Sequence, residues 1–196
     1  MNDVEFVSYH KIARLKRSIS ITEKIDGTNA QIHIRPAEGS RMLPGYDTQV
    51  EVDGQQCYMR AGSRKRWISP DDDNYGFARW AYNNAPELAA LGIGTHFGEW
   101  WGNGIQRNYS QTKKIFSLFN TRRWGSAETR PSCCDVVPVL YEGEFHSERI
   151  KAQIRLLAAH GSVAAPGFME PEGVVVCHLG GLFKQTIEND DVGKGQ

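Results

Sequence analysis

Hydrophobic and polar residues alternate with a period of two in several short segments of this chain. In residues 30–35, Ala30, Ile32 and Ile34 alternate with polar side chains, which is the pattern of a strand with one buried face. Glycine occurs 20 times and separates many such segments, as is typical of antiparallel sheet proteins. The strands that this pattern predicts are 19–23, 30–35, 50–52, 56–61, 94–101, 114–119, 136–141, 173–177 and 182–187.

Helical periodicity is clearest in residues 147–160. The apolar residues recur there at intervals of three or four and form one stripe: Ile150, Ile154, Leu157 and Ala158. We expect Ser147 to cap the first turn and Gly161 to end the helix. Shorter helices are expected at 74–82 and 86–91.

Two Asp-Gly pairs, Asp26-Gly27 and Asp53-Gly54, lie between predicted strands and favour hairpin turns. Residues 35–49 are expected to form a loop or an irregular hairpin. Strands and helices do not alternate regularly along the chain. The sequence therefore favours an α+β fold with antiparallel sheets over a parallel α/β fold.

The composition excludes several classes of protein. Lys and Arg total 23, as do Asp and Glu, so a polybasic surface is excluded but a local basic groove is not. No segment approaches the roughly 18 apolar residues of a membrane span, and the N-terminus lacks the apolar core of a signal peptide. The four cysteines match neither a zinc site nor a disulfide scaffold: Cys57, Cys133, Cys134 and Cys177. We therefore expect a cytoplasmic protein with reduced thiols.

A chain of 196 residues fits one domain. We place that domain at residues 1–188 and expect residues 189–196 to form a frayed tail. The sequence ends soon after the last predicted strand. No second domain is therefore expected at the C-terminus.

The main candidate for a catalytic residue, Lys24, lies in a turn-forming segment. The neighbours of this lysine in Lys24-Ile25-Asp26-Gly27-Thr28-Asn29 are mostly small or polar, so the amine is free to face a cleft. By itself the Lys-x-Asp-Gly pattern is also compatible with a solvated lysine on a surface hairpin. Four further segments follow it in order: Phe97-Gly98-Glu99-Trp100-Trp101-Gly102, Lys114 to Asn120, Pro171 to Val176 and Leu182 to Thr186.

Together these segments resemble the motifs of covalent nucleotidyltransferases, the polynucleotide ligases and, more distantly, the mRNA capping enzymes. The resemblance runs in the family's order over residues 23–186. The Gly-Thr-Asn that ends motif I resembles the RNA ligases of the second phage type. The matching segments are 23–29 for motif I, 60–64 for the Ser-Arg element, 97–102 for motif III, 116–120 for motif IIIa, 172–175 for motif IV and 182–184 for motif V.

The resemblance implies a ligase-type nucleotidyltransferase fold, with antiparallel sheets flanking a nucleotide cleft, and a covalent mechanism. Lys24 would attack the α-phosphorus of ATP and form a lysyl-AMP adduct. A lysine amine is almost fully protonated near neutral pH, so nearby positive charge or desolvation must favour its neutral form. Lys184 and Mg²⁺ (or Mn²⁺) would supply that charge, and Glu172 would hold the metal or orient Lys24.

The same resemblance assigns the nucleotide contacts. Glu99 would accept a hydrogen bond from a ribose hydroxyl, and Phe119 would stack on adenine. Arg64 would contact the ribose or the 5′-phosphate end. The remaining residues expected to contact the nucleotide are Glu23, Ile25, Asn29, Glu172 and Lys184.

Other roles remain open for several of these residues. Glu99 could be a paired strand carboxylate, Glu172 could cap a turn, and Phe119 could belong to the core, with Phe116 as an alternative stacking residue. The run Arg64-Lys65-Arg66-Trp67 interleaves cations with an aromatic ring, which fits either a nucleic-acid groove or a solvated surface.

The implied function is that of an ATP-dependent RNA ligase that joins 5′-phosphate and 3′-hydroxyl ends. Motif V usually carries two lysines separated by one residue, whereas this chain has only Lys184 in Lys184-Gln185-Thr186. Because the sequence ends at Gln196, a partner protein could supply the nucleic-acid clamp. A DNA ligase, a GTP-using capping-type transferase and a non-catalytic module that binds nucleic-acid ends are the alternatives.

Overall fold

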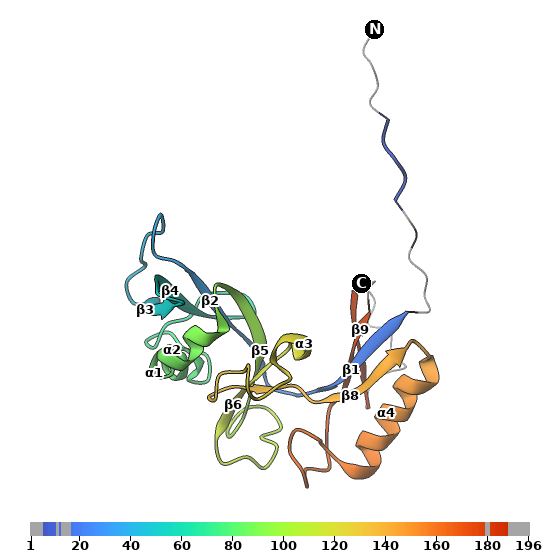
Figure 1. Cartoon of the computed structure of the whole chain (residues 1–196). Helices are drawn as coiled ribbons and strands as arrows, with labels where there is room; N and C mark the ends of the chain where they lie inside the picture. The colour runs from blue at the N-terminus through green and yellow to red at the C-terminus, as the bar shows by residue number, and fades with distance from the viewer. Residues whose placement is uncertain (1–5, 11, 13–16, 179–180, 188–196) are drawn as a thin grey trace.

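The computed structural model describes residues 6–10, 12, 17–178 and 181–187. It consists of two sheets joined by the middle of the chain, with few helices (Figure 1). The strand order is β10-β9-β1-β8 in the four-stranded sheet and β3-β4-β2-β5-β6-β7 in the six-stranded sheet. All neighbouring strands are antiparallel except β6 and β7. The predicted α+β fold with antiparallel sheets is therefore confirmed.

The strands are β1 (Ser18–Lys24), β2 (Thr28–Pro36), β3 (Asp47–Val52), β4 (Gln55–Ser63), β5 (Gly94–Gly102), β6 (Lys114–Leu118), β7 (Asp135–Val136), β8 (Val139–Glu144), β9 (Gly173–His178) and β10 (Gly181–Thr186). The helices are α1 (Phe77–Asn83), α2 (Ala85–Leu88), the short 3₁₀ helix η1 (Ala89–Leu91), α3 (Thr121–Trp124) and α4 (Ser147–His160).

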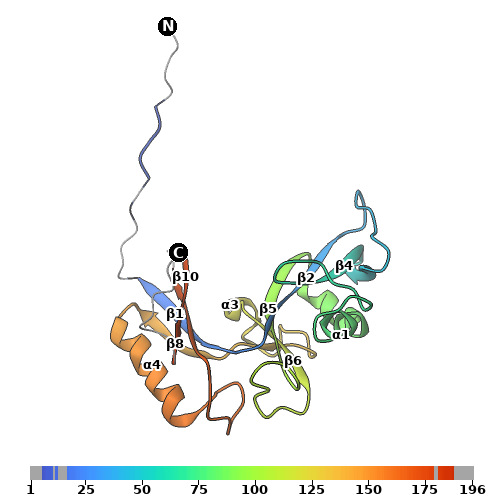
Figure 2. The same cartoon turned by 180° about the vertical axis from the view of Figure 1, so that it is seen from behind.

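The four-stranded sheet is covered on one face by α4, as both views show (Figures 1 and 2). The side chains of Ile19, Ile21, Val174 and Val176 form a buried cluster with Leu157 of the helix. These residues alternate along β1 and β9, so the intervening side chains point away from the helix. Those intervening positions include Thr22 and Lys24, which leaves Lys24 on the uncovered face.

The six-stranded sheet buries its other set of alternating residues against α1 and α2. On β2 the buried residues are Ala30, Ile32 and Ile34, as the sequence pattern predicts. The aromatic rings of Phe77 and Trp80 in α1 pack on this face. We call the opposite face of this sheet the open face.

The Asp26-Gly27 pair does not form the expected hairpin. Strand β1 pairs with β8 and β9, whereas β2 pairs with β4 and β5, so the two strands belong to different sheets. Residues 25–27 are the crossing between the sheets, visible in Figure 1 as the dark blue segment near the middle of the molecule. An Asp-Gly pair specifies a sharp turn but not the strand partners on either side. The hairpin at Asp53-Gly54, between β3 and β4, is confirmed.

Four other local features differ from what the sequence pattern predicts. The predicted strand 136–141 is interrupted before Pro138 and forms two strands in different sheets, β7 and β8. Helix α3 was not predicted, because its four residues are too short to show a period. Ser147 is the first helical residue of α4, and its N-cap residue is His146, which makes no side-chain capping bond. Ala158 is exposed rather than part of the buried stripe.

Residues 17–178 and 181–187 contain all of the elements above, and the expected domain boundary at residue 188 lies outside the described residues. The predicted tail at 189–196 lies outside the described residues. Among the helices of the described ranges, none has the length and apolar character that a membrane crossing requires.

Candidate functional site

The predicted nucleophile lies where the two sheets meet. Lys24 is the last residue of β1, and its Nζ donates a hydrogen bond to the carboxylate of Glu172, just before β9. The register of β1 with β9 pairs Lys24 with Gly173, which explains why these two distant motifs touch. The side chains of Lys24 and Glu172 are 23 % and 18 % exposed, so the ion pair is partly buried but can still be reached by a ligand.

The backbone of the turn after Lys24 is held by side chains from the β5 region. The amide of Asp26 donates to the hydroxyl of Tyr109 at 2.8 Å, and the amide of Gly27 donates to Glu99 at 3.1 Å. The Asp26 carboxylate accepts a hydrogen bond from Arg107 at 3.1 Å. Three residues of β5 and the following loop therefore fix the direction in which the chain leaves Lys24.

The loop between β5 and β6 supplies Arg107 and Tyr109, and none of the sequence motifs includes this loop. Arg107 also donates from Nη1 to the carbonyl of Glu170 at 3.0 Å, so it connects motif I to the segment before Glu172. Four non-glycine residues of this loop have positive φ angles, between 44° and 61°: Gln106, Asn108, Tyr109 and Ser110. Such angles are strained, so the surrounding contacts must over-determine the loop. In the sequence, only the turn-forming residues Gly102-Asn103-Gly104 mark it.

Replacing Tyr109 with phenylalanine should test this support. Tyr109 is fully buried, and the variant would leave the Asp26 amide without its partner. We expect a loss of about 1–3 kcal/mol in the free energy of unfolding, measured by chemical denaturation. The matched control is Tyr82→Phe, whose exposed hydroxyl donates to Gly45 and whose loss should cost under about 1 kcal/mol. Equal losses in the two variants would contradict the role of Tyr109.

Glu99 is a largely buried carboxylate beside this turn. Burial raises the pKa of Glu99 from 4.5 to about 7, although the positive charge of Lys24 and the amide of Gly27 oppose the shift. The negative charges of Glu172 and Asp26 add to the rise. Glu99 therefore changes its charge near neutral pH, close to Lys24.

This raised pKa predicts how a Glu99→Gln variant depends on pH. The folded protein favours the protonated carboxyl, so the stability from Glu99 is present below about pH 4.5 and is lost as the pH rises to about 7. Glutamine stays neutral and can still accept from the Gly27 amide. We expect similar free energies of unfolding near pH 5 and a more stable variant near pH 8, by up to roughly 3 kcal/mol. A difference that does not change with pH would refute this assignment.

Two predicted nucleotide contacts, Glu23 and Ile25, have side chains that point into the protein. The carboxylate of Glu23 accepts hydrogen bonds from the hydroxyl of Ser162 and from the amides of Val163 and Ala164, at 2.5, 2.8 and 2.9 Å. Ile25 is 4 % exposed in a core cluster with Trp101. The geometry of these side chains gives them structural roles. Contact of these two residues with the nucleotide stays a prediction. Such a contact would have to come from their backbone atoms, because both side chains are buried.

Asn29 and Glu99 lie opposite each other on the open face. They are paired in the register of β2 with β5, and Ser117 of β6 continues the same row. Phe119 follows β6, is 40 % exposed, and donates its amide to Phe97 at 2.9 Å. Its ring is therefore available for stacking, whereas the alternative, Phe116, is fully buried and cannot stack on a ligand.

Lys184 and Arg64 lie farther from Lys24. Lys184 is exposed on β10, and its register with Val175 and Thr22 puts it on the same sheet face as Lys24. It lies two strand spacings across and two residues along from Lys24, or roughly 12 Å away. A lysine side chain can extend over much of that distance. Arg64 is exposed in the turn that follows β4.

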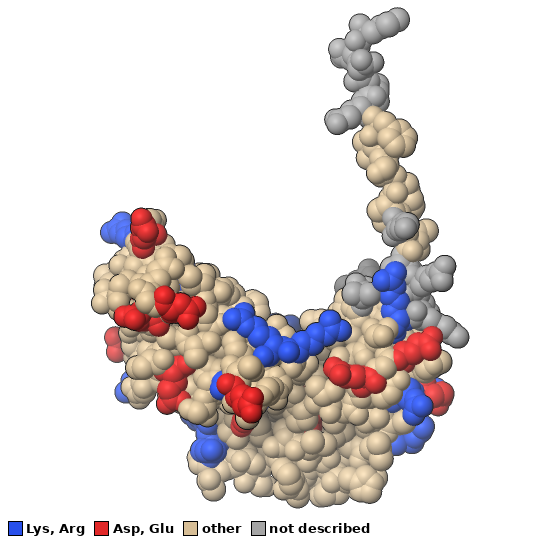
Figure 3. All heavy atoms as spheres, in the orientation of Figure 1, with Lys and Arg blue, Asp and Glu red and all other residues tan. Residues whose placement is uncertain are grey.

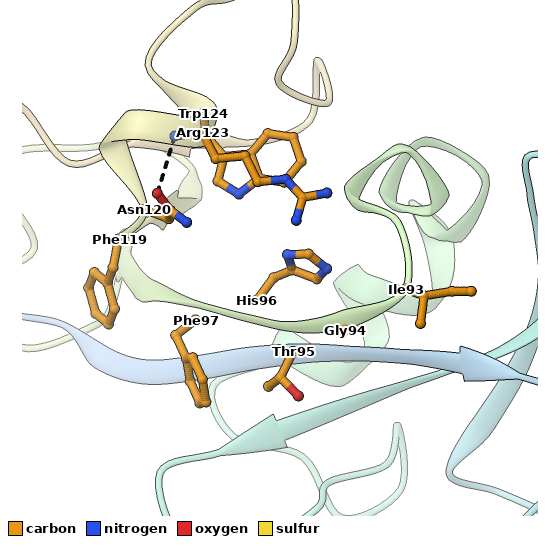
Figure 4. A pocket seen from close by; sticks show the side chains of 9 residues that line it. All are labelled: Ile93, Gly94, Thr95, His96, Phe97, Phe119, Asn120, Arg123 and Trp124. Carbon is orange, nitrogen blue, oxygen red and sulfur yellow. Dashed lines mark hydrogen bonds between the residues drawn. The ribbon is translucent and has the colours of Figure 1, made fainter.

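The site opens into a hollow between the two sheets. Figure 3 shows this hollow with Lys and Arg side chains gathered along it, over the position of α3. A cavity of about 220 Å³ adjoins Phe97 and Phe119, and Arg123 of α3 also lines it (Figure 4). In the described part of the chain, no three His, Cys, Asp or Glu side chains are grouped as a metal site.

Comparison with known proteins agrees with this geometry. A family model for RNA ligases matches residues 17–186. The chain belongs to the RNA ligase family. The match contains every motif discussed above, so the resemblance of the sequence motifs is confirmed at the level of the family. No curated protein matches the chain.

Solved structures show the same fold in this family. An apo Lys-to-Ala mutant of Naegleria gruberi RNA ligase is 19 % identical, with a TM-score of 0.50, and the match covers 86 % of this chain and 49 % of that one. An Arg-to-Ala mutant of Naegleria gruberi RNA ligase with ATP and Mn is also 19 % identical, with a TM-score of 0.49 and coverage of 88 % and 50 %. The chain thus spans about half the length of the solved structures that it matches.

Proposed function

We propose that this protein is an ATP-dependent RNA ligase that works through a covalent adduct between Lys24 and AMP. The observation that carries the proposal is the pairing of Lys24 with Glu172, beside the buried carboxylate of Glu99. Motifs I, III and IV of the family meet at this point although they are far apart in the sequence. A lysine that only solvates the protein surface would not need a paired glutamate and a second carboxylate beside it.

The first step would join Lys24 to the nucleotide. The neutral Nζ attacks the α-phosphorus of ATP, a phosphorus–nitrogen bond forms, and the bond to the departing pyrophosphate breaks. Glu172 fixes the direction of Nζ through its hydrogen bond. Lys184, on the same sheet face, places positive charge where negative charge develops on the phosphate oxygens.

The residues fit a divalent cation that is shared with the substrate. Mg²⁺ or Mn²⁺ usually keeps several waters and binds through one or two carboxylates together with phosphate oxygens. Glu172 offers one partly exposed carboxylate in this position. When bound, the cation would neutralise charge on the phosphates.

The open face would hold the rest of the nucleotide. Glu99 contacts the turn that follows Lys24. In its ionised form, the Glu99 carboxylate would accept a hydrogen bond from a ribose hydroxyl. Phe119 would stack on adenine through its exposed ring. Asn29, opposite Glu99, and Arg64 would add polar contacts to the ribose or to a phosphate.

The later steps would use RNA that carries a 5′-phosphate and a 3′-hydroxyl. AMP passes from Lys24 to the 5′-phosphate, and the 3′-hydroxyl then attacks that phosphorus and releases AMP. Family membership favours RNA over DNA as the substrate. A partner protein that adds contacts to the nucleic acid is part of this proposal.

A non-catalytic module that binds nucleic-acid ends is the second candidate function. It is favoured by one observation, the single lysine of Lys184-Gln185-Thr186 where the family usually has two. The transfer step distinguishes this module from a ligase, because the module would not pass AMP to a 5′-phosphate.

Incubation with α-labelled ATP and a divalent cation tests the proposal. We expect a labelled protein band on a denaturing gel, with the modification mapped to Lys24 by mass spectrometry of peptides. Labelled GTP should give no band, which would exclude a capping-type transferase. Adding 5′-phosphorylated RNA should then discharge the adduct, and matched DNA should do so more slowly. An unlabelled protein that also carries no prior AMP by intact mass would defeat the proposal.

A further inference from the structure

The open face of the six-stranded sheet carries aromatic side chains in one row that crosses four strands. Trp67 pairs with Gly62 of β4, Gly62 with Gln31 of β2, and Gln31 with Phe97 of β5. Phe119, after β6, continues the row through its hydrogen bond to Phe97. Paired residues point to the same face of a sheet. We call Trp67, Phe97 and Phe119 the aromatic row.

All three rings of the aromatic row are exposed. Trp67 is 39 %, Phe97 48 % and Phe119 40 % exposed. The neighbouring Trp100 and Phe116, which point to the other face, are buried. Figure 4 shows the rings of Phe97 and Phe119 next to each other at the mouth of the cavity. Exposed aromatic rings on neighbouring strands offer flat apolar surfaces to a ligand.

Trp67 is held in place before any ligand binds. Two backbone hydrogen bonds flank it, from Ser63 to Arg66 at 2.8 Å and from Ile68 to Ala61 at 3.1 Å. Gly62 lets the indole lie close to the sheet, because a Cβ at this position would come within 3.0 Å of the ring.

Arg60 adds to this support from the neighbouring position on β4. Its guanidinium lies 5.4 Å from the centre of the Trp67 ring and is itself fixed by hydrogen bonds to Asp47 at 2.7 and 2.8 Å. Arg60 is therefore engaged in holding the indole. Stacking on Trp67 would cost little conformational entropy, since the ring is already ordered.

Cations stand next to the aromatic row at the Trp67 end. In the turn before Trp67, Arg66 pairs with Asp72. Arg64 and Lys65 are exposed, and neither has a hydrogen-bond or ion-pair partner among residues 17–178 and 181–187. Exposed aromatic rings with available cations at one end suit a chain of bases and phosphates, and they suit an apolar protein surface poorly.

We infer that the aromatic row binds unpaired bases of the RNA substrate, with Trp67 and Phe97 as stacking platforms and Arg64 and Lys65 at the phosphates. The inference rests on the proposed function, in which Phe119 serves the adenine of the nucleotide. Glu99 lies two residues beyond Phe97 on the same face, about 7 Å away. A strand on the row would therefore pass close to Glu99, which lies beside Lys24. The substrate class is single-stranded RNA or an unpaired end, since stacked and paired bases of a continuous duplex do not expose their faces.

Tryptophan fluorescence provides a direct test that does not need ATP. Of the five tryptophans, all within the described residues, only Trp67 is exposed. Iodide quenching should therefore report mainly on Trp67. A single-stranded RNA of about 12 nucleotides with a 5′-phosphate should protect it in a saturable manner, and a blunt duplex of the same sequence should not. Protection by the duplex alone, or by neither RNA, would overturn the inference.

Variants separate stacking from folding and from catalysis. Trp67→Ala and Phe97→Ala should each weaken binding of the single-stranded RNA by about tenfold, measured by fluorescence anisotropy of labelled RNA. Trp67→Phe keeps a flat ring and should restore most of the affinity. Leu156→Ala, an exposed residue on α4, is the control and should bind like the wild type.

Adduct formation with ATP distinguishes this inference from the proposed function. The adduct should be unchanged in Trp67→Ala, which keeps Phe119 and Lys24. If the wild type forms no adduct but RNA still protects Trp67, the proposed function fails and the RNA site stands. If the adduct forms and both alanine variants bind RNA like the wild type, the RNA site fails alone. If Trp67→Ala does not fold, binding of the single-stranded RNA by Phe97→Ala tests the RNA site instead.

Discussion

Lys24→Ala should abolish the labelled protein–AMP band, a loss of at least roughly 10³-fold. Among residues 17–178 and 181–187, no other lysine pairs with Glu172, so no second amine of these ranges takes the position of Lys24. The free energy of unfolding should change by about 1 kcal/mol or less, because both members of the ion pair are partly exposed. The band is measured by gel, and stability by chemical denaturation.

Two matched variants make this result interpretable. Lys24→Arg keeps a cation opposite Glu172 but cannot supply a neutral amine, so it should also lack the band. Lys151→Ala removes an exposed lysine of α4 that pairs with Glu148, and it should be labelled like the wild type. A labelled Lys24→Ala protein would show that another residue is the nucleophile.

Gly27→Ala should reduce adduct formation by about 10²-fold, the second largest effect that we expect. A Cβ at this position would lie 2.5 Å from the carbonyl oxygen of Trp100 and 2.7 Å from the Cβ of Trp101. Both atoms belong to β5 and cannot move away easily, so the turn itself must shift. Such a shift would break the hydrogen bond from Gly27 to Glu99 and displace Lys24.

The stability of the Gly27→Ala variant should fall by about 1–3 kcal/mol, as for an overpacked core site. Gly39→Ala is the control, because Gly39 has a φ of 72° and open space around its Cβ position. It should lose about 1 kcal/mol from backbone strain and keep full labelling. Full labelling of Gly27→Ala would mean that the crossing between the sheets does not position Lys24.

Local patterning predicted much of the fold but not how its parts are assembled. Strands such as β2 and β5 were found at nearly their observed bounds, because alternation is a property of neighbouring residues. The pairing of β1 with β8 and β9 was not found, since partners 100 and more residues away are chosen by packing. The Asp26-Gly27 turn shows the difference, because its sequence favours a hairpin whereas the sheets require a crossing.

The candidate site divides in the same way. Lys24, Glu99, Phe119 and Glu172 were identified from motifs, and the structure brings Lys24, Glu99 and Glu172 together. Phe119 lies farther along the open face, one row from Glu99. The motif resemblance assigned stacking to Phe119 with Phe116 as an alternative, and burial excludes Phe116 as a stacking residue.

By itself the sequence determined the secondary structure of most segments and the family, and it predicted the residues that would carry the chemistry. Each of these depends on residue types and short spacings. Only the tertiary structure decided that Glu23 supports the loop at 162–164, that Arg107 and Tyr109 hold the turn after Lys24, and that Trp67 shares a row with Phe97. These roles depend on which side chains meet across sheets and loops, and contacts of that kind arise from the packing of the whole chain.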